Sequence, residues 1–113
     1  MRYRIWPLVL LLPAACSSGP PGSAKLILNN PSWDRVNAQI VITRSADCDQ
    51  RGEGFISTRE FVMRKDKSEA IEVPKGASVC WRHDRNPNSP VSGAWTGWSR
   101  ATLLPGQDTE TEL

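Results

Sequence analysis

Few side chains in this sequence are suited to acid–base chemistry near neutral pH. His83 is the single histidine and stands in Trp81-Arg82-His83-Asp84, near the expected end of a strand. A hydrolytic site needs a nucleophile, a base and a group that orients the base. The sequence has no Gly-x-Ser-x-Gly motif, and it offers no paired catalytic carboxylates or activated thiol. We therefore predict that His83 is structural or solvated, that the protein is not an enzyme, and that it binds no cofactor.

The acids around the second cysteine suggest a metal loop but do not complete one. Asp47 and Asp49 are two residues apart, as in a calcium loop. Arg51 then stands where a third oxygen ligand is needed, and no bidentate glutamate follows. A zinc site would need closely spaced ligand pairs, which two distant cysteines and one histidine do not supply. We predict no metal site and interpret residues 45–58 as a loop pinned by Cys48.

Four tryptophans lie beyond residue 15, at positions 33, 81, 95 and 98. Trp81 alternates correctly for a core position, and Trp33 follows the first expected turn. Trp95 and Trp98 are three apart, so a regular strand turns them to opposite faces unless Gly97 forms a bulge. An exposed tryptophan can stack on a sugar or anchor a protein interface. We therefore take Trp95 and Trp98, with the loop 86–93, as a candidate binding surface; the alternative is that the second ring covers the other sheet face or lies at the membrane interface.

The first 15 residues have the three parts of a secretory signal peptide. Two arginines open it, residues 5–12 form an apolar run, and Pro13-Ala14-Ala15 precede Cys16. The run is about half the roughly 20 residues that a membrane-spanning helix needs, so we expect no permanent transmembrane helix. Small residues directly before a cysteine resemble the lipobox of bacterial lipoproteins.

The resemblance covers only the leader, and residues 24–113 resemble no specific family. Leu12-Pro13-Ala14-Ala15-Cys16 departs from the lipobox at Pro13, where leucine is commonest. The resemblance implies that the Cys16 thiol receives a diacylglyceryl group, that a peptidase cuts before it, and that its new amino group is acylated, for example with palmitate. More than one acyl chain makes membrane attachment stable. The alternatives are ordinary signal cleavage without acylation, for example after Ala24, and an uncleaved anchor.

The number of cysteines fits lipidation at Cys16. Three cysteines leave one odd thiol in an exported chain unless one of them has another fate. With Cys16 acylated, Cys48 and Cys80 remain as an even pair, and we predict a disulfide between them because the envelope is oxidising. A bridge that closes about 33 residues contributes roughly 3–4 kcal/mol. Strand parity places Cys80 opposite Trp81, so we expect this bridge on a sheet face or edge.

Residues 16–23 form the predicted lipidated cysteine and tether. Ser17-Ser18-Gly19-Pro20-Pro21-Gly22-Ser23 contains only serine, glycine and proline, which is typical of a linker. Seven such residues span about 15 Å as a flexible coil, so the domain would lie close to the membrane. Ser17 follows the cysteine where aspartate would signal retention in the inner membrane. The resemblance therefore implies the periplasmic face of the outer membrane.

The remaining residues, 24–113, show a period of two, with turn residues about every ten positions. Such a pattern predicts an all-β domain, a small antiparallel β-sandwich of immunoglobulin-like or transthyretin-like architecture with six or seven strands and one disulfide. The strongest alternation covers residues 36–43, which gives one apolar and one mainly polar face. The other expected strands cover residues 25–28, 59–65, 70–73, 77–82, 94–104 with a break at Gly97, and 109–113.

Composition limits the function. The chain has 113 residues and a net charge of +2, and the excess comes from Arg2 and Arg4 in the leader. A small neutral domain does not supply the clustered basic residues that bind phosphates, so we predict no nucleic-acid partner. We expect a membrane-attached, non-catalytic structural or interaction module of the cell envelope, an accessory subunit whose partners are other envelope proteins. The alternative is a protein that binds a glycan or small ligand through Trp95 or Trp98.

Overall fold

The computed structural model describes residues 22–113. The predicted signal peptide, Cys16 and most of the predicted tether lie outside the described residues. Seven strands form the described part, which confirms the predicted all-β class. They are β1 (Ala24–Asn30), β2 (Arg35–Thr43), β3 (Phe55–Arg64), β4 (Lys67–Val73), β5 (Ser78–His83), β6 (Ser99–Thr102) and β7 (Asp108–Glu112). Among these residues there is no helix of the length and apolarity that a membrane crossing requires.

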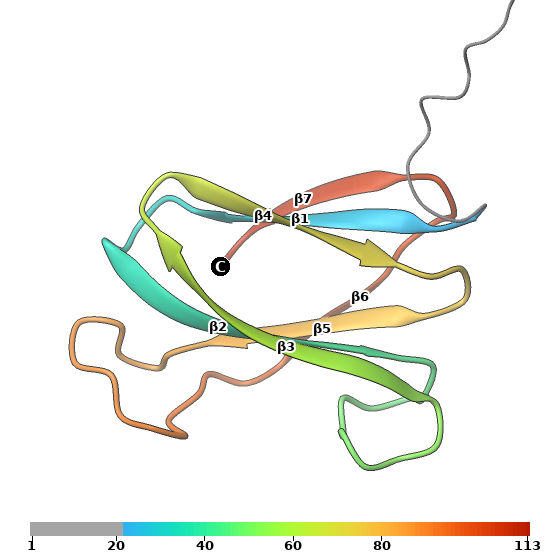
Figure 1. The fold of residues 1–113 in the computed structure, drawn as a ribbon, viewed down its shortest axis with the longest axis horizontal. Coiled ribbons are helices and arrows are strands. Elements are labelled where there is room, and N and C mark those ends of the chain that lie inside the picture. The colour runs from blue at the N-terminus through green and yellow to red at the C-terminus, as the bar shows by residue number, and fades with distance from the viewer. Residues whose placement is uncertain (1–21) are drawn as a thin grey trace, which may run out of the picture.

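The strands form two sheets that pack face to face as a sandwich (Figure 1). Sheet A has the order β4-β1-β7, and sheet B has the order β3-β2-β5-β6. Every pairing between strands is antiparallel except that of β1 with β7, which is parallel. In the constant-type immunoglobulin order the first strand shares a sheet with the second, fourth and fifth, whereas here β1 shares its sheet with β4 and β7. The two sheets and seven strands confirm the predicted β-sandwich.

The core lies between the sheets, and β1 shows most clearly the alternation that builds it. In β1 every second residue is buried, because successive side chains of a strand point to opposite faces. Trp33, Trp81 and Leu113 are partly buried and pack against the core, as predicted for Trp81. The core cluster consists of Leu26, Leu28, Val36, Ile40, Ile42, Met63, Ile71, Val73, Ala77 and Val79.

The connections gather at the two ends of the sandwich. The start of β1 lies at the same end as the β4–β5 and β6–β7 turns, and the long connection between β5 and β6 lies at the other end (Figure 1). Backbone hydrogen bonds fasten the chain from Ser23 onward, since Gly106 N donates to Ser23 O at 2.8 Å and Lys25 N donates to Gln107 O at 3.0 Å. The entry point of the chain is therefore fixed to one end of the sandwich.

β6 is shorter than the run expected over residues 94–104. It covers only Ser99–Thr102, and the preceding residues form turns and one isolated bridge, Asp84 with Trp95. Pro87 and Pro90 fall within this connection and lack the backbone donors that a ladder needs. This irregular connection places the two tryptophans of the candidate surface.

Candidate functional site

His83 has a packing role at the end of β5. Its ring lies 4.8 Å from the Trp33 ring, centroid to centroid, with the planes tilted by 42°. Its Nδ1 lies 2.8 Å from the Asp84 carbonyl oxygen, so this nitrogen carries the proton and donates. The Asp84 carboxylate is buried and accepts from the backbone and side-chain nitrogens of Asn37 at 2.8 and 2.9 Å. These contacts join the end of β5 to the start of β2.

The aspartates of the loop between β2 and β3 accept hydrogen bonds from backbone amides of the same loop. Asp47 Oδ1 accepts from Asp49 N at 3.1 Å, and Asp49 Oδ1 accepts from Arg51 N at 2.9 Å. Asp49 also pairs with the Arg51 side chain, which is 91% exposed. Within residues 22–113 no group of three or more His, Cys, Asp or Glu is placed to hold a metal ion.

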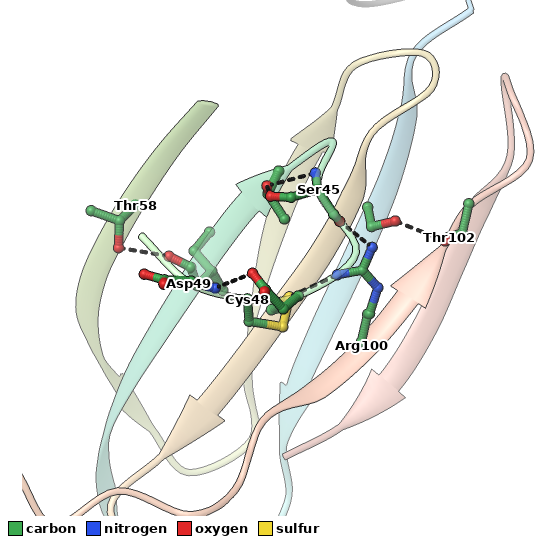
Figure 2. Close-up of a disulfide and its surroundings, with 11 residues drawn as sticks. Ser45, Cys48, Asp49, Thr58, Arg100 and Thr102 are labelled. Carbon is green, nitrogen blue, oxygen red and sulfur yellow. Dashed lines mark hydrogen bonds between the residues drawn. A yellow bond between two sulfur atoms is a disulfide. The ribbon is translucent and has the colours of Figure 1, made fainter. Parts of the chain in front are cut away.

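The disulfide joins this loop to the outward face of sheet B. Cys48 and Cys80 are bonded, with their Cα atoms 6.1 Å apart, which confirms the predicted pairing. Figure 2 shows Arg100 beside the bridge, where its Nη2 donates to the Ser45 carbonyl oxygen at 2.7 Å. Cys80 and its register partner Val41 are fully buried although both point away from the core. The pinned loop thus covers one half of the outward face of sheet B.

Trp95 and Trp98 lie together on the other half of that face, and each is partly exposed. Trp81 pairs with Ser99, and Asp84 bridges Trp95. The three residue steps from Trp81 to Asp84 therefore lie opposite four residue steps from Ser99 back to Trp95. The extra residue is a bulge, and it turns both tryptophans to the same side.

The Arg82 guanidinium lies over both rings. Its guanidinium carbon is 4.1 Å from the Trp98 ring centroid and 5.2 Å from that of Trp95. Its Nε donates to Gln39 Oε1 at 2.7 Å, and Gln39 Nε2 donates to Glu60 at 3.4 Å. Burial lowers the pKa of the Arg82 guanidinium, and the charge of Glu60 opposes that shift.

We define the outer patch as Val62, Glu60, Gln39, Arg82, Trp95 and Trp98. Register brings these residues together: Glu60 is paired with Gln39, and Gln39 with Arg82. Val62 follows Glu60 by two residues on the same face and is 45% exposed. Trp95 and Trp98 were predicted from the sequence as a binding surface, whereas Arg82 was not, although its place between Trp81 and His83 assigns it to the outward face.

Comparisons with known proteins point to a fold and to no family. No protein-family model matches the sequence, and no curated protein matches it. The described fold is similar to the crystal structure of the T6SS lipoprotein TssJ1 from Pseudomonas aeruginosa, with a TM-score of 0.52 and 12% identity. The match covers 82% of this chain and 88% of that chain. At this identity the likeness shows a shared fold, and that fold is one used by a T6SS lipoprotein.

Proposed function

We propose that this protein is a lipid-anchored lipoprotein of the bacterial envelope and a non-catalytic accessory subunit of a type VI secretion (T6SS) assembly. The observation that carries the proposal is the likeness to a T6SS lipoprotein over most of both chains. The lipobox-like sequence before Cys16 supports a matching anchor on this chain. We place the anchor at the periplasmic face of the outer membrane, because Ser17 is no inner-membrane retention signal.

The entry point of the chain into the sandwich supports an anchored function. β1 is fastened by hydrogen bonds from Ser23 onward, so the predicted tether between Cys16 and the sandwich is only about six residues long. The end that carries the β6–β7 turn would then lie nearest the membrane. The opposite end, with the 84–98 connection, and the outward sheet faces would be free for partners.

The surroundings of the titratable groups near the outer patch support a non-catalytic function. The His83 Nδ1 donates to a backbone carbonyl oxygen, and the Asp84 carboxylate accepts two hydrogen bonds from Asn37. Neither group is paired with a serine, threonine or thiol nucleophile by a hydrogen bond among the described residues. The side chains that remain open to solvent on the outer patch are of the kind that bind proteins.

The test compares deletion, complementation and lipid labelling in the native bacterium. Wild-type protein should incorporate a palmitate label and restore export of a T6SS effector to a deletion strain. Cys16→Ser should incorporate no label and should fail to restore export, at equal protein levels on an immunoblot. Crosslinking followed by purification in mild detergent should retain envelope proteins with wild type and lose them with Cys16→Ser.

Two results would contradict separate parts of the proposal. Full restoration of export by unlabelled Cys16→Ser would show that the anchor is dispensable. Normal export in the deletion strain would remove the link to type VI secretion and leave only the shared fold.

A further inference from the structure

We propose that the outer patch of sheet B is the docking surface for an acidic side chain of a partner envelope protein, with the Arg82 guanidinium as the receptor for its carboxylate. This rests on the proposed function, because it assumes that the protein acts through a protein partner. It assigns the contact to a small set of residues on one face of one sheet.

The guanidinium of Arg82 is only partly satisfied within the described chain. Its Nε is occupied by Gln39, whereas Nη1 and Nη2 make no hydrogen bond to another described residue. Glu60 is near enough to influence the pKa of Arg82 but makes no salt bridge with it among residues 22–113. A guanidinium with two free donors in a fork matches the two oxygens of a carboxylate. The partly desolvated site strengthens such a pair relative to one in open water.

The tryptophan rings hold the guanidinium in place before a partner arrives. Arg82 lies over both Trp95 and Trp98, and its Nε bond to Gln39 fixes the rotation of the fork. A long side chain that is already ordered loses less entropy when it binds. Tryptophan and arginine are also the residues that contribute most at the centres of protein interfaces. The patch therefore combines a fixed charge with apolar walls.

The charge of the surrounding face favours an acidic partner. Arg35 and Arg64 are paired with each other at the end of the β2–β3 ladder. Both lie on the same face as Val62 and Glu60, because they are separated from this row by even numbers of residues. Glu60 is the single acid at the outward positions of β2, β3, β5 and β6, and the buried Asp84 carboxylate just beyond β5 accepts from Asn37. An acidic surface would approach this face with favourable long-range electrostatics.

A protein partner fits the patch better than a glycan or a second copy of the chain. Arg82 already covers one face of each indole ring, which takes up surface that a sugar would stack on. The outward face of sheet A is acidic and could approach the patch of another copy. The outward face of its three short strands has an area of only about 300 Å², estimated from strand spacing and rise. A standard interface buries about 800 Å² per partner, so this face is too small for stable self-association.

The experiment places a photo-crosslinking amino acid at two exposed apolar positions of the full-length lipidated protein in the native bacterium. Val62 lies on the outer patch and is 45% exposed; Leu104 lies on the β6–β7 turn and is 65% exposed. We expect an adduct with one envelope protein from Val62 and not from Leu104. Mass spectrometry should place that adduct next to an aspartate or glutamate.

Arg82 variants test the role of the charge. Arg82→Glu should reduce the Val62 adduct at least about tenfold. Arg82→Lys, which keeps the charge but not the fork, should reduce it less. Changing the crosslinked partner's acid to lysine should restore the adduct with Arg82→Glu. Because Arg82→Glu could disturb folding, thermal unfolding of each variant is measured, and Arg64→Glu, at an exposed site on the same face, serves as a second variant that should also reduce the adduct.

Each other outcome overturns the proposal. An adduct with a second copy of the chain assigns the face to self-association, and an adduct with a glycan assigns it to sugar binding. No adduct from Val62, or an adduct that Arg82→Glu leaves unchanged, shows that the patch is not the docking surface. If the detergent purification still retains partners that depend on Cys16, the proposed function stands and only this assignment fails.

Discussion

The two sheets of the sandwich share one core but differ on their outward faces. β1, the central strand of sheet A, alternates along its whole length between buried and half-buried residues. β2, a central strand of sheet B, is buried on both faces from Ala38 to Thr43. The outward face of sheet A presents Lys25, Ile27, Asn29, Ser68, Ala70, Glu72, Asp108, Glu110 and Glu112, all at least partly exposed.

The difference shows how a small sandwich can bury more than one layer. The outward positions Val41, Thr43, Ser78 and Cys80 of sheet B are buried because the loop pinned by the disulfide covers them. Their hydroxyls are satisfied: Thr43 Oγ1 lies 2.7 Å from Ser45 Oγ, and Ser78 Oγ lies 2.8 Å from Thr102 Oγ1. Sheet B thus has a second, thin buried layer on its outward side. Arg82, with Trp95 and Trp98, extends this layer toward the outer patch.

Removal of the disulfide should have the largest effect on this difference. The variant with both Cys48→Ala and Cys80→Ala loses the loop-closure contribution, so its free energy of unfolding should fall by about 3–4 kcal/mol. Urea denaturation measures the loss. Hydrogen exchange should speed up at β2 and β5 before it does at β1, because the cover over sheet B is released. Equal acceleration in both sheets would show that the loop does not protect one face selectively.

A matched pair of substitutions compares the two outward faces directly. Val41→Ala removes two buried methyl groups on the outward face of sheet B and should cost about 2 kcal/mol, from transfer and cavity terms. Ile27→Ala removes a larger group from the half-buried outward face of sheet A and should cost less than about 1 kcal/mol. Thermal unfolding of the two variants is the measurement. A larger loss for Ile27→Ala would mean that sheet A, and not sheet B, is covered.

The Arg82–Trp98 contact should have a smaller and separable effect on stability. A double-mutant cycle with Arg82→Gln, Trp98→Ala and the combined variant should give a coupling free energy of about 1 kcal/mol, as expected for a partly desolvated cation–π pair. A parallel cycle on the exposed Asp49–Arg51 pair should give less than about 0.5 kcal/mol. Equal couplings in the two cycles would show that the stacked arginine is no more fixed than a surface ion pair.

The sequence predicted the sandwich and the disulfide because each depends on a simple count. Alternation over residues 36–43 identified β2, and the parity of the cysteines paired Cys48 with Cys80. It did not predict that the polar side of β2 is buried, because the cover comes from the loop around Cys48, which the alternation of β2 itself does not reveal. The side taken by Trp95 and Trp98 depended on one extra residue opposite β5, and parity counting fails where a bulge intervenes.

The smallest expected effect concerns the exposed acids of β7. Asp108, Glu110 and Glu112 point to the same side of an edge strand at two-residue spacing, so their charges repel one another. Glu110→Gln keeps an acceptor for Asn29 Nδ2, which now lies 3.1 Å from Glu110 Oε1. It should therefore raise the free energy of unfolding by a few tenths of a kcal/mol.

That gain should vanish in about 1 M salt, which screens charges beyond roughly 3 Å, and urea denaturation at low and high salt measures it. The same acids protect an unpaired edge, because charge on an edge strand discourages pairing with another chain. A variant with glutamine at both positions 110 and 112 should thus have a slightly higher free energy of unfolding, and it should still aggregate faster on heating. A gain that persists in high salt would point to packing in place of charge. The acids of sheet A would then serve solubility at little cost in stability, whereas the charge of Arg82 on sheet B is held in a fixed geometry for a partner.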